Sequence, residues 1–396
     1  MEFSKATIEI FSKLEQQWLS HCDTACKKIR ILCIDGGGTN ADCAGTSLVH
    51  LERQIRLCAG DASARISDFF DIFAGSGVGA ILAAMLVAAD VSGRPMFSAC
   101  EAVSFLSNKR ADLFRPKKTF GFRRRRFSGK SMEKVLKEVF TRIDGKVMTL
   151  RDTCKPLLVP CFDLKSSAPF VFSRTGAIDS ANFDFDLWKI CRASSATPGM
   201  FTPFNFTSVD GKTSCSAIDG GIVMNNPAAL AVTHVIHNNQ DFPTVTSVDD
   251  LLVLSLGNGP SSQRYFSPPM NKGKSIGKGM FSTSAVVGIA ADGVSEAVDQ
   301  MLGNAFCWNR SNYLRIQTNG SASEGRNLAG TNEAQRVLRE RGIETLPFGG
   351  KRLLAENNGE RIDRFVERLL VPGRSSLPPS PCKISPITVN PIANGR

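Results

Sequence analysis

The sequence FFDIFAGSGVGAILAAMLVAA, residues 69–89, joins two apolar runs through a turn that contains three glycines. The run Phe69–Ala74 predicts the end of a buried strand, and the run Ala80–Ala89 predicts a buried helix. A turn of the type G-x-S-x-G in this context presents a nucleophilic serine on a strained backbone between small neighbours. Here the central residue is Gly77, which relieves the strain and lacks the hydroxyl. The pattern by itself also fits a plain glycine-rich turn.

A second hydroxyl lies next to this central position. Ser76 precedes Gly77, and on so sharp a turn its side chain should point away from the place where a nucleophile attacks. We therefore expect Ser76 to hydrogen-bond a nearby backbone group. The flanking Gly75 and Gly79 are expected to let the strand and the helix approach each other.

A glycine triplet follows the first apolar strand of the chain. Ile29–Ile34 predicts a buried strand, Asp35 and the triplet Gly36, Gly37 and Gly38 come next, and a helix is expected at about 44–57. Glycines here let backbone N–H groups approach an anion, and a helix N-terminus favours negative charge. The loop is therefore a candidate for holding a phosphate or stabilising an oxyanion. A tight strand-to-helix turn explains the triplet equally simply.

An aspartate with two glycines marks a third position. Asp219, Gly220 and Gly221 follow an apolar strand that ends at Ile218 and precede the sequence MNNP at residues 224–227. A carboxylate in a tight turn at a strand end can act as the general base of a Ser–Asp dyad. Asp also stabilises ordinary turns by accepting from nearby amides, so the motif alone leaves both interpretations open.

Strand-like and helix-like segments alternate along most of the chain. Further strands are expected at 156–162, 169–173 and 251–256, and further helices include 131–142, 186–195, 228–237, 284–302, 332–341 and 361–370. This alternation predicts an α/β fold with a mostly parallel central sheet and helices on both faces. We assign residues 29–371 to this domain. Residues 1–28 read as an amphipathic helix, and residues 372–396 as a disordered Pro/Ser-rich tail.

The composition fits a globular protein that favours anionic partners. The net charge is +11 over 396 residues, which attracts acidic lipid surfaces, nucleic acid and acidic proteins without choosing among them. The 12 cysteines include no CxxC pair, so no zinc site is expected and nothing demands a cofactor. Unpaired cysteines without an export signal indicate a reducing compartment, and the longest apolar run, 79–89, is too short to span a bilayer.

A basic segment lies between residues 114 and 130 and contains no acidic residue. It includes Arg123, Arg124, Arg125 and Arg126, with Phe114, Phe120, Phe122 and Phe127 interleaved. Each basic residue near an anionic membrane contributes about 1 kcal/mol, and phenylalanine inserts at the interface. We therefore predict a cytoplasmic protein that docks peripherally on an anionic membrane surface. A nuclear localisation signal and a solvated loop are the alternatives.

Together these motifs resemble the patatin-like acyl hydrolases. Asp35–Gly38 is similar to that family's oxyanion loop, Gly75–Gly79 to its nucleophile elbow and Asp219–Gly221 to its catalytic aspartate motif. The segments Arg192–Pro198 and Leu254–Gly259 match in the same order, and the resemblance covers residues 29–370. It implies a patatin-like fold, a phospholipase A type of activity on phospholipid or galactolipid, Asp219 as the base, and the glycine triplet as the oxyanion loop.

Two positions depart from the family's pattern. Gly77 stands in place of the serine, and Asn40 stands where the family usually has Arg or Lys. The glycine form is most similar to a plant branch, the group III patatin-related phospholipases, which is associated with lipid acyl hydrolysis. One interpretation is therefore low or unconventional activity. The other is a catalytically inactive pseudoenzyme that binds lipid or a protein partner.

A different class of function remains open for the glycine loop. The sequence DGGGTN at residues 35–40 also resembles the phosphate loop of actin-like sugar kinases. That fold needs further phosphate and adenosine loops in two related lobes, and it leaves Gly75–Gly79 and Arg192–Pro198 unexplained. We therefore expect lipid partners and no nucleic acid.

Overall fold

The computed structural model describes residues 13, 28–39, 41–117, 127–259, 283–318, 331–346 and 350–370. The chain divides into two units, one made of residues 1–28 and 371–396 and the other of Ile29–Leu370. The predicted N-terminal helix and C-terminal tail therefore lie outside the described residues, apart from Lys13 and Lys28. The elements that follow all belong to the unit Ile29–Leu370.

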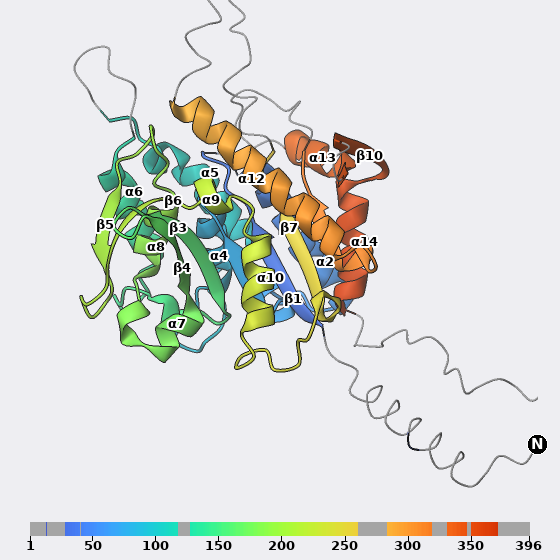
Figure 1. The fold of residues 1–396 in the computed structure, drawn as a ribbon, viewed down its shortest axis with the longest axis horizontal. Coiled ribbons are helices and arrows are strands. Elements are labelled where there is room, and N and C mark those ends of the chain that lie inside the picture. The colour runs from blue at the N-terminus through green and yellow to red at the C-terminus, as the bar shows by residue number, and fades with distance from the viewer. Residues whose placement is uncertain are drawn as a thin grey trace, which may run out of the picture. The chain divides into compact units, whose positions relative to one another are not determined.

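A mixed sheet forms the centre of this unit (Figure 1). Its strands are β1 (Ile29–Ile34), β2 (Ile72–Gly75), β3 (Leu157–Asp163), β4 (Ala168–Ser173), β5 (Phe204–Thr207), β6 (Ser214–Asp219), β7 (Leu251–Leu256) and β8 (Tyr313–Ile316). They lie in the order β5-β6-β3-β2-β1-β7-β8, and β4 pairs with β3 outside this path. The central run from β3 to β8 is parallel, whereas β4, β5 and β6 join by antiparallel pairs. The predicted α/β fold with a mostly parallel central sheet is confirmed.

Alternate residues of β1 are buried on opposite faces of the sheet. Leu32 and Ile34 belong to one apolar cluster, whereas Ile31 and Cys33 belong to another. Successive side chains of a strand point to opposite faces, so both faces are covered. This explains why β1 is apolar at almost every position instead of alternating apolar and polar residues.

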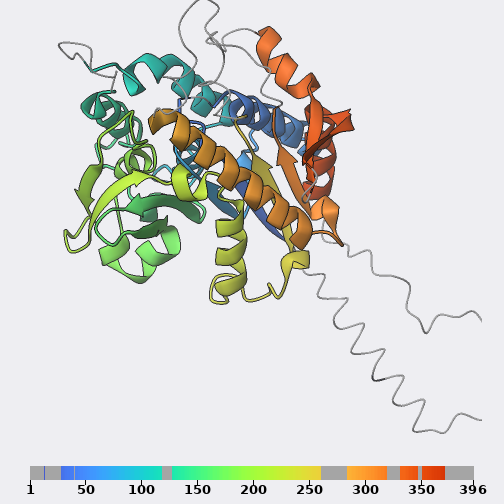
Figure 2. The ribbon, with the colours of Figure 1, turned by 45° about the horizontal axis from the view of Figure 1, so that its top comes forward.

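Different helices cover the two faces. The helices α2 (Asp42–Ala59), α4 (Val78–Val87), α5 (Ala99–Leu113), α6 (Gly129–Val139) and α8 (Leu187–Ser194) contribute to the cluster of Leu32 and Ile34. The helices α10 (Ala228–His237) and α12 (Thr283–Ala305) contribute to the cluster of Ile31 and Cys33. Figure 1 shows α10 and α12 in front of the sheet, and the tilted view of Figure 2 keeps them on that side.

Further helices lie between these elements. They are α3 (Ile66–Phe69), α7 (Arg174–Asp179), α9 (Gly221–Met224) and α13 (Thr331–Arg339), with single 3₁₀ turns at Leu150–Asp152, Ala181–Phe183, Val248–Asp250 and Arg310–Asn312. Within the described ranges, no helix combines the length and the apolar character that crossing a membrane requires.

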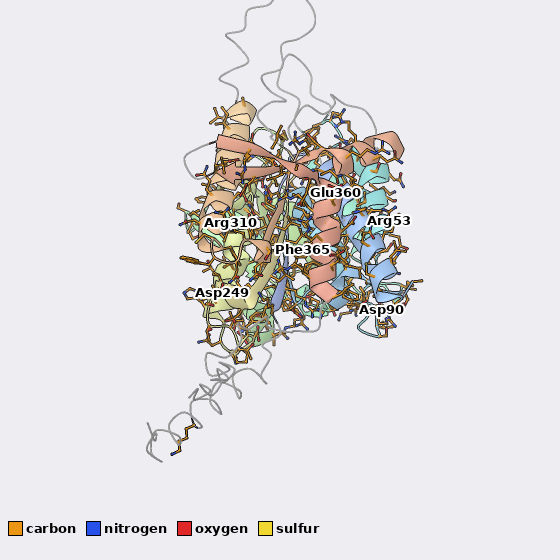
Figure 3. All side chains as sticks on the ribbon, turned by 90° about the vertical axis from the view of Figure 1, so that its right-hand side faces the viewer. Arg53, Asp90, Asp249, Arg310, Glu360 and Phe365 are labelled. Carbon is orange, nitrogen blue, oxygen red and sulfur yellow. The ribbon has the colours of Figure 1, made fainter. Side chains whose placement is uncertain are left out.

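A C-terminal helix packs beside α2. The antiparallel pair β9 (Arg341–Leu346) and β10 (Gly350–Asn357) leads into α14 (Asn358–Leu370), which lies next to α2 in Figure 3. The Phe365 ring stacks on Phe70 with centroids 6.3 Å apart, and His50 Nε2 lies 2.7 Å from Asp363 Oδ1. This helix therefore completes the core on the side of the sheet that carries α2.

One edge of β3 pairs with two different strands. Leu157 and Leu158 pair with the end of β2, and Cys161–Asp163 pair with the end of β6. Because β4 occupies the opposite edge of β3, β2 and β6 share one edge and run towards each other. Their last residues are Gly75 and Asp219, so the topology brings the turns that follow them together.

Candidate active site

The turn between β2 and α4 has a strained backbone. Gly77 has φ 54° and ψ −123°, a region that residues with a Cβ atom rarely occupy and that costs them about 1–3 kcal/mol. A Cβ atom on Gly79 would lie 2.4 Å from the carbonyl oxygens of Ile34 and Asp35. Glycine at position 79 therefore lets α4 begin against the end of β1. The turn lies where the sequence predicts it.

The glycine triplet lies directly beside this turn. The Gly36 N–H donates to the Asn225 carbonyl at 3.0 Å, so this amide already has its partner. This pairing corrects the expectation that Gly36 supplies an oxyanion donor. The oxyanion role expected of Gly37 and Gly38 stays a prediction, and Gly38 turns the loop with φ 62°.

The side chain of Asp219 is held at both of its oxygens. Oδ2 accepts from Thr197 Oγ1 at 2.5 Å, and Oδ1 accepts from the Gly221 N–H at 2.7 Å. The Asp219 N–H donates to the Ala196 carbonyl at 3.1 Å, and the residue is only 8% exposed. These hydrogen bonds fix the carboxylate within the turn, and the role of Asp219 as a general base stays a prediction.

Gly77 and Asp219 face each other where β2 and β6 converge. A Cβ atom on Gly77 would lie 3.8 Å from Asp219 Oδ1 and 3.5 Å from Gly36 Cα, its nearest neighbour. Both are ordinary van der Waals distances, so there is room for the Cβ atom of a serine, although the positive φ strains any residue that carries one. Its hydroxyl, one bond further out, would come within hydrogen-bond reach of Oδ1 in a suitable rotamer. The three sequence motifs thus meet at one place in the fold.

The segment Arg192–Pro198 links the turn to the aspartate. Ser194 Oγ accepts from the Gly77 N–H at 3.0 Å and donates to the Pro160 carbonyl at 2.8 Å, and Thr197 holds Asp219. Sequence reasoning noted this segment but gave no role to either hydroxyl. The available signal was the run of hydroxyl residues between a helix and a proline.

Burial raises the pKa of Asp219 above the ordinary aspartate value, and the hydrogen bonds from Thr197 and Gly221 act in the opposite direction. A general base works best when its pKa lies nearer the operating pH than that of a free carboxylate. The environment therefore makes Asp219 a stronger base than a solvated aspartate, while two donors keep it oriented.

Ser76 does not take the role expected of its side chain. The residue is fully buried, and within the described ranges its hydroxyl has no hydrogen-bond partner. The prediction that this hydroxyl satisfies a local backbone group is therefore wrong. Its main chain holds the turn instead: the Ser76 N–H donates to the Ile34 carbonyl at 3.1 Å, and the Ser76 carbonyl accepts from the Ala80 N–H at 3.2 Å.

A buried ion pair supports the glycine loop. Arg315 Nη1 and Nη2 donate to Asp35 Oδ1 and Oδ2 at 2.8 and 2.5 Å, and Asn258 Nδ2 donates to the Asp35 carbonyl at 2.9 Å. Burial acts to lower the pKa of Arg315, but the Asp35 carboxylate outweighs it and raises this pKa above its ordinary value. Burial raises the pKa of Asp35, and Arg315 acts to lower it, so the two buried side chains depend on each other as a pair. Arg315 was not among the residues predicted from the sequence. A charged residue within the otherwise apolar segment YLRI nevertheless indicates a buried ion pair.

The basic segment is described only at its two ends. Residues 118–126, which include the predicted membrane-surface residues Arg123–Arg126, lie outside the described ranges. The rings of Phe114 and Phe127 are 5.7 Å apart, and Phe127 lies 5.5 Å from Phe201. These two phenylalanines therefore pack within the fold, which corrects the expectation that they insert into a membrane.

Comparison with known proteins identifies the family. The sequence model described as patatin-like phospholipase matches residues 32–232, from β1 through the turn at Gly77 to α10. The chain belongs to the patatin-like phospholipase family. It is 63% identical to "Probable inactive patatin-like protein 9" of Arabidopsis thaliana over 100% of both chains. It is 40% identical to "Patatin-like protein 6" of the same plant, covering 87% of this chain and 72% of that one.

The resemblance to patatin-like proteins stated from the motifs is therefore confirmed, and both of these relatives are plant proteins. Among solved structures, VipD from Legionella pneumophila aligns with a TM-score of 0.35 at 12% identity, covering 86% of this chain and 67% of that chain. That score is too low to support any argument about the site of this patatin-like protein.

Proposed function

We propose that this patatin-like protein binds phospholipid or galactolipid esters on an acyl hydrolase framework and hydrolyses them slowly, without a serine nucleophile. The observation that carries the proposal is the oriented Asp219 carboxylate, whose Oδ1 faces the Cβ position of Gly77 at 3.8 Å. Family membership supports a lipid ester as the ligand class. The preserved turn supports a site shaped for acyl transfer.

The proposed chemistry uses water in place of the serine hydroxyl. Asp219 Oδ1 removes a proton from a water molecule as the water oxygen attacks the ester carbonyl. The amides of Gly37 and Gly38 stabilise the negative oxygen that forms. Collapse of the tetrahedral intermediate breaks the carbon–oxygen bond, and Asp219 returns the proton to the leaving alcohol. The products are a fatty acid and a lysolipid, and no acyl-enzyme forms.

The expected rate follows from what a hydroxyl contributes elsewhere. In subtilisin, removing the serine lowers kcat by about 2 × 10⁶, and the remaining site still retains about 10³–10⁴ over water. A comparable loss of kcat makes this protein a slow hydrolase at most. Lipid binding does not need the hydroxyl, so the protein should bind lipid even where its hydrolysis is very slow.

A second candidate is an inactive lipid-binding protein on the same framework. It is favoured by the full-length relative at 63% identity, whose name describes it as probably inactive. Both candidates use the same site and differ only in turnover.

We also propose that the basic segment docks the protein on anionic membranes. Its support is the four consecutive arginines Arg123–Arg126 together with the net charge of +11. Co-sedimentation with vesicles should be stronger for anionic than for neutral lipid, and it should weaken as salt is raised. Equal co-sedimentation with both vesicle types would contradict an electrostatic docking role.

The function is tested by acyl release from phospholipid and galactolipid vesicles. The proteins compared are the wild type, Asp219→Asn, Gly77→Ser and the double variant Gly77→Ser/Asp219→Asn. Slow release by the wild type that Asp219→Asn abolishes supports the water mechanism. Gly77→Ser should be the fastest, and the double variant should lose that gain.

Two other outcomes decide against the first proposal. No release by the wild type, with release by Gly77→Ser, makes the natural protein the inactive lipid binder. Release by the wild type that is equal in Asp219→Asn removes Asp219 from the chemistry. Gly77→Ala is the matched control, because it adds the Cβ atom without the hydroxyl.

A further inference from the structure

A buried arginine of α8 lies against the first turn of α6, the helix packed beside it (Figure 1). Arg192 is 1% exposed, and within the part of the chain that the structure describes its Nε and Nη1 atoms have no hydrogen-bond partner. A Cβ atom on Gly129, the first residue of α6, would lie 2.7 Å from Arg192 Nη2. Buried donors of a charged group are costly when they are unused, so they favour an anionic ligand.

Two aromatic rings hold the guanidinium in place. Arg192 Cζ lies 4.8 Å from the ring centroid of Phe201 and 5.2 Å from that of Phe204. Such contacts stabilise the cation without using its hydrogen-bond donors. The N–H groups of an arginine form paired hydrogen bonds with the oxygens of a phosphate or carboxylate. The position of Arg192 is therefore fixed while donors remain for a ligand.

The carboxylate of Glu133 compensates the buried charge only in part. Its Oε1 lies 3.5 Å from Arg192 Nε, which is longer than an ordinary N–H···O hydrogen bond. The Glu133 side chain is 30% exposed. Burial lowers the pKa of Arg192, and the Glu133 carboxylate acts to raise it. Because the pKa is lowered on balance, Glu133 does not offset the cost of burying the guanidinium.

The start of α6 adds positive potential next to Arg192. The first amides of a helix have no intrahelical acceptor, and the helix dipole gives this end a partial positive charge. Ser128 Oγ accepts from the Ser131 amide at 3.3 Å, and Lys130 is exposed. Residues 114–130 contain no acidic residue, so this stretch of chain supplies no carboxylate. An 11-residue helix whose first turn reaches solvent can bind an anion.

We propose that the first turn of α6 and Arg192 bind a phosphate group, from a phospholipid head group or from free phosphate. The amides of Gly129 and Lys130 donate to its oxygens together with the guanidinium. The site is separate from Gly77, because Arg192 precedes Ser194, the partner of the Gly77 amide, by two residues, and such residues of a helix do not face the same way. The inference therefore goes beyond the proposed function and does not depend on turnover.

The first test is isothermal titration of the full chain with inorganic phosphate at constant ionic strength. Glu133→Gln should tighten binding by about tenfold, because it removes the carboxylate that competes for Arg192. Glu138→Gln is the matched control, since Glu138 is an exposed carboxylate on the same helix, and it should bind as the wild type does. A purely structural pair of Arg192 and Glu133 predicts no phosphate binding. Absence of binding, or equal affinity of Glu133→Gln and the wild type, would overturn the proposal.

A second variant locates the phosphate group. Gly129→Ala displaces the guanidinium without removing its charge and should weaken phosphate binding by about tenfold. Alanine is also the better helix former, so the variant should fold, which circular dichroism checks. Gly293→Ala is the matched control, because Gly293 lies in α12 and a Cβ atom there has no neighbour within 4 Å. Unchanged binding by Gly129→Ala would place the phosphate elsewhere and refute the site.

Two kinds of vesicle identify the source of the phosphate group. Both consist of galactolipid, which carries no phosphate, and have the same surface charge, supplied by phosphatidic acid in one and by oleate in the other. A preference for phosphatidic acid that Gly129→Ala loses assigns the site to a lipid head group. Equal binding to both vesicles, with phosphate binding in the titration, assigns it to free phosphate. Equal binding to both vesicles without phosphate binding in the titration reflects general charge alone and overturns the proposal.

These measurements are distinguishable from the test of hydrolysis. A protein that binds phosphate but releases no acyl group retains this site and loses the hydrolytic proposal. A protein that hydrolyses lipid without binding phosphate retains the proposed function and loses this site.

Discussion

Asp219 Oδ1 lies 3.8 Å from the position that a Cβ atom of residue 77 would occupy, although the two residues come from strands that approach β3 from opposite directions. Thr197 and Gly221 hold the carboxylate in place, and Ser194 holds the Gly77 amide. The residues expected around a serine at position 77 are therefore held in place around a glycine.

The turn itself should tolerate a side chain at position 77 better than at position 79. Gly77→Ala adds a Cβ atom with no contact closer than 3.5 Å, and the unusual backbone conformation should lower the free energy of unfolding by about 1–3 kcal/mol. Gly79→Ala places its Cβ atom 2.4 Å from two backbone carbonyls and should cost more, because β1 and α4 must separate. Denaturant titration of both variants measures this, and an equal cost would contradict the close approach of α4 to β1 at Gly79.

The hydrogen bond from Thr197 should set the pH at which a restored enzyme becomes active. This bond acts to lower the pKa of Asp219 against the larger effect of burial. In a Gly77→Ser background, Thr197→Val should therefore raise that pKa further and move the acid limb of the pH–rate profile to higher pH. Ser76→Ala is the control, because the Ser76 hydroxyl has no partner in the described part of the chain. An unmoved limb in Thr197→Val would show that Asp219 is not the titrating base.

Continuous apolar runs made most of the central elements predictable. The bounds of β1, β7 and α10 agree with the sequence expectation because each run is buried along its length or ends in clear turn residues. The helix α5 was missed because its sequence mixes apolar and polar residues without a clear period. Its N-terminus was nevertheless readable, since Ser98 and Glu101 form a capping box. The strands β8, β9 and β10 contain charged residues and lack a continuous apolar run, so the sequence did not predict them.

The site was predictable in its parts and not in its assembly. The sequence located the three glycine-containing motifs, and the family resemblance gave their roles. Contacts such as Arg315 with Asp35 or Ser194 with Gly77 join residues far apart in the chain. Local pattern carries no information on such pairs, because the topology around β3 and β7 creates them. For the same reason, the sequence predicted a hydrogen-bond partner for the Ser76 hydroxyl, and the described part of the chain contains none.

The buried pair between Asp35 and Arg315 should dominate the stability of the glycine loop. Both side chains are at most 6% exposed, so Arg315→Met leaves an unpaired buried carboxylate and should cost about 3–5 kcal/mol of unfolding free energy. The exposed pair between Arg352 and Glu344 is the matched control, and Arg352→Met should cost at most about 1 kcal/mol. Denaturant titration compares the two. A small loss for Arg315→Met would mean that the pair does not anchor the loop.

The raised pKa of Asp219 should appear as an opposite pH dependence of stability in two aspartate variants. Burial makes the folded state bind this proton more tightly than the unfolded state does. The resulting stabilisation is complete below the unfolded value of 3.8 and is lost as pH rises through the raised folded pKa. Asp219→Asn has no such loss, so its Tm relative to the wild type should increase from about pH 4 to about pH 8.

Asp163 supplies the contrast: burial acts to raise its pKa, but hydrogen bonds from Ser216 and Ser166 outweigh it and lower the pKa to about 2. Asp163→Asn should therefore lose Tm relative to the wild type over the pH range above about 4, where the ionised carboxylate stabilises the fold. Parallel pH dependence in the two variants would show that the two carboxylates do not have opposite pKa shifts.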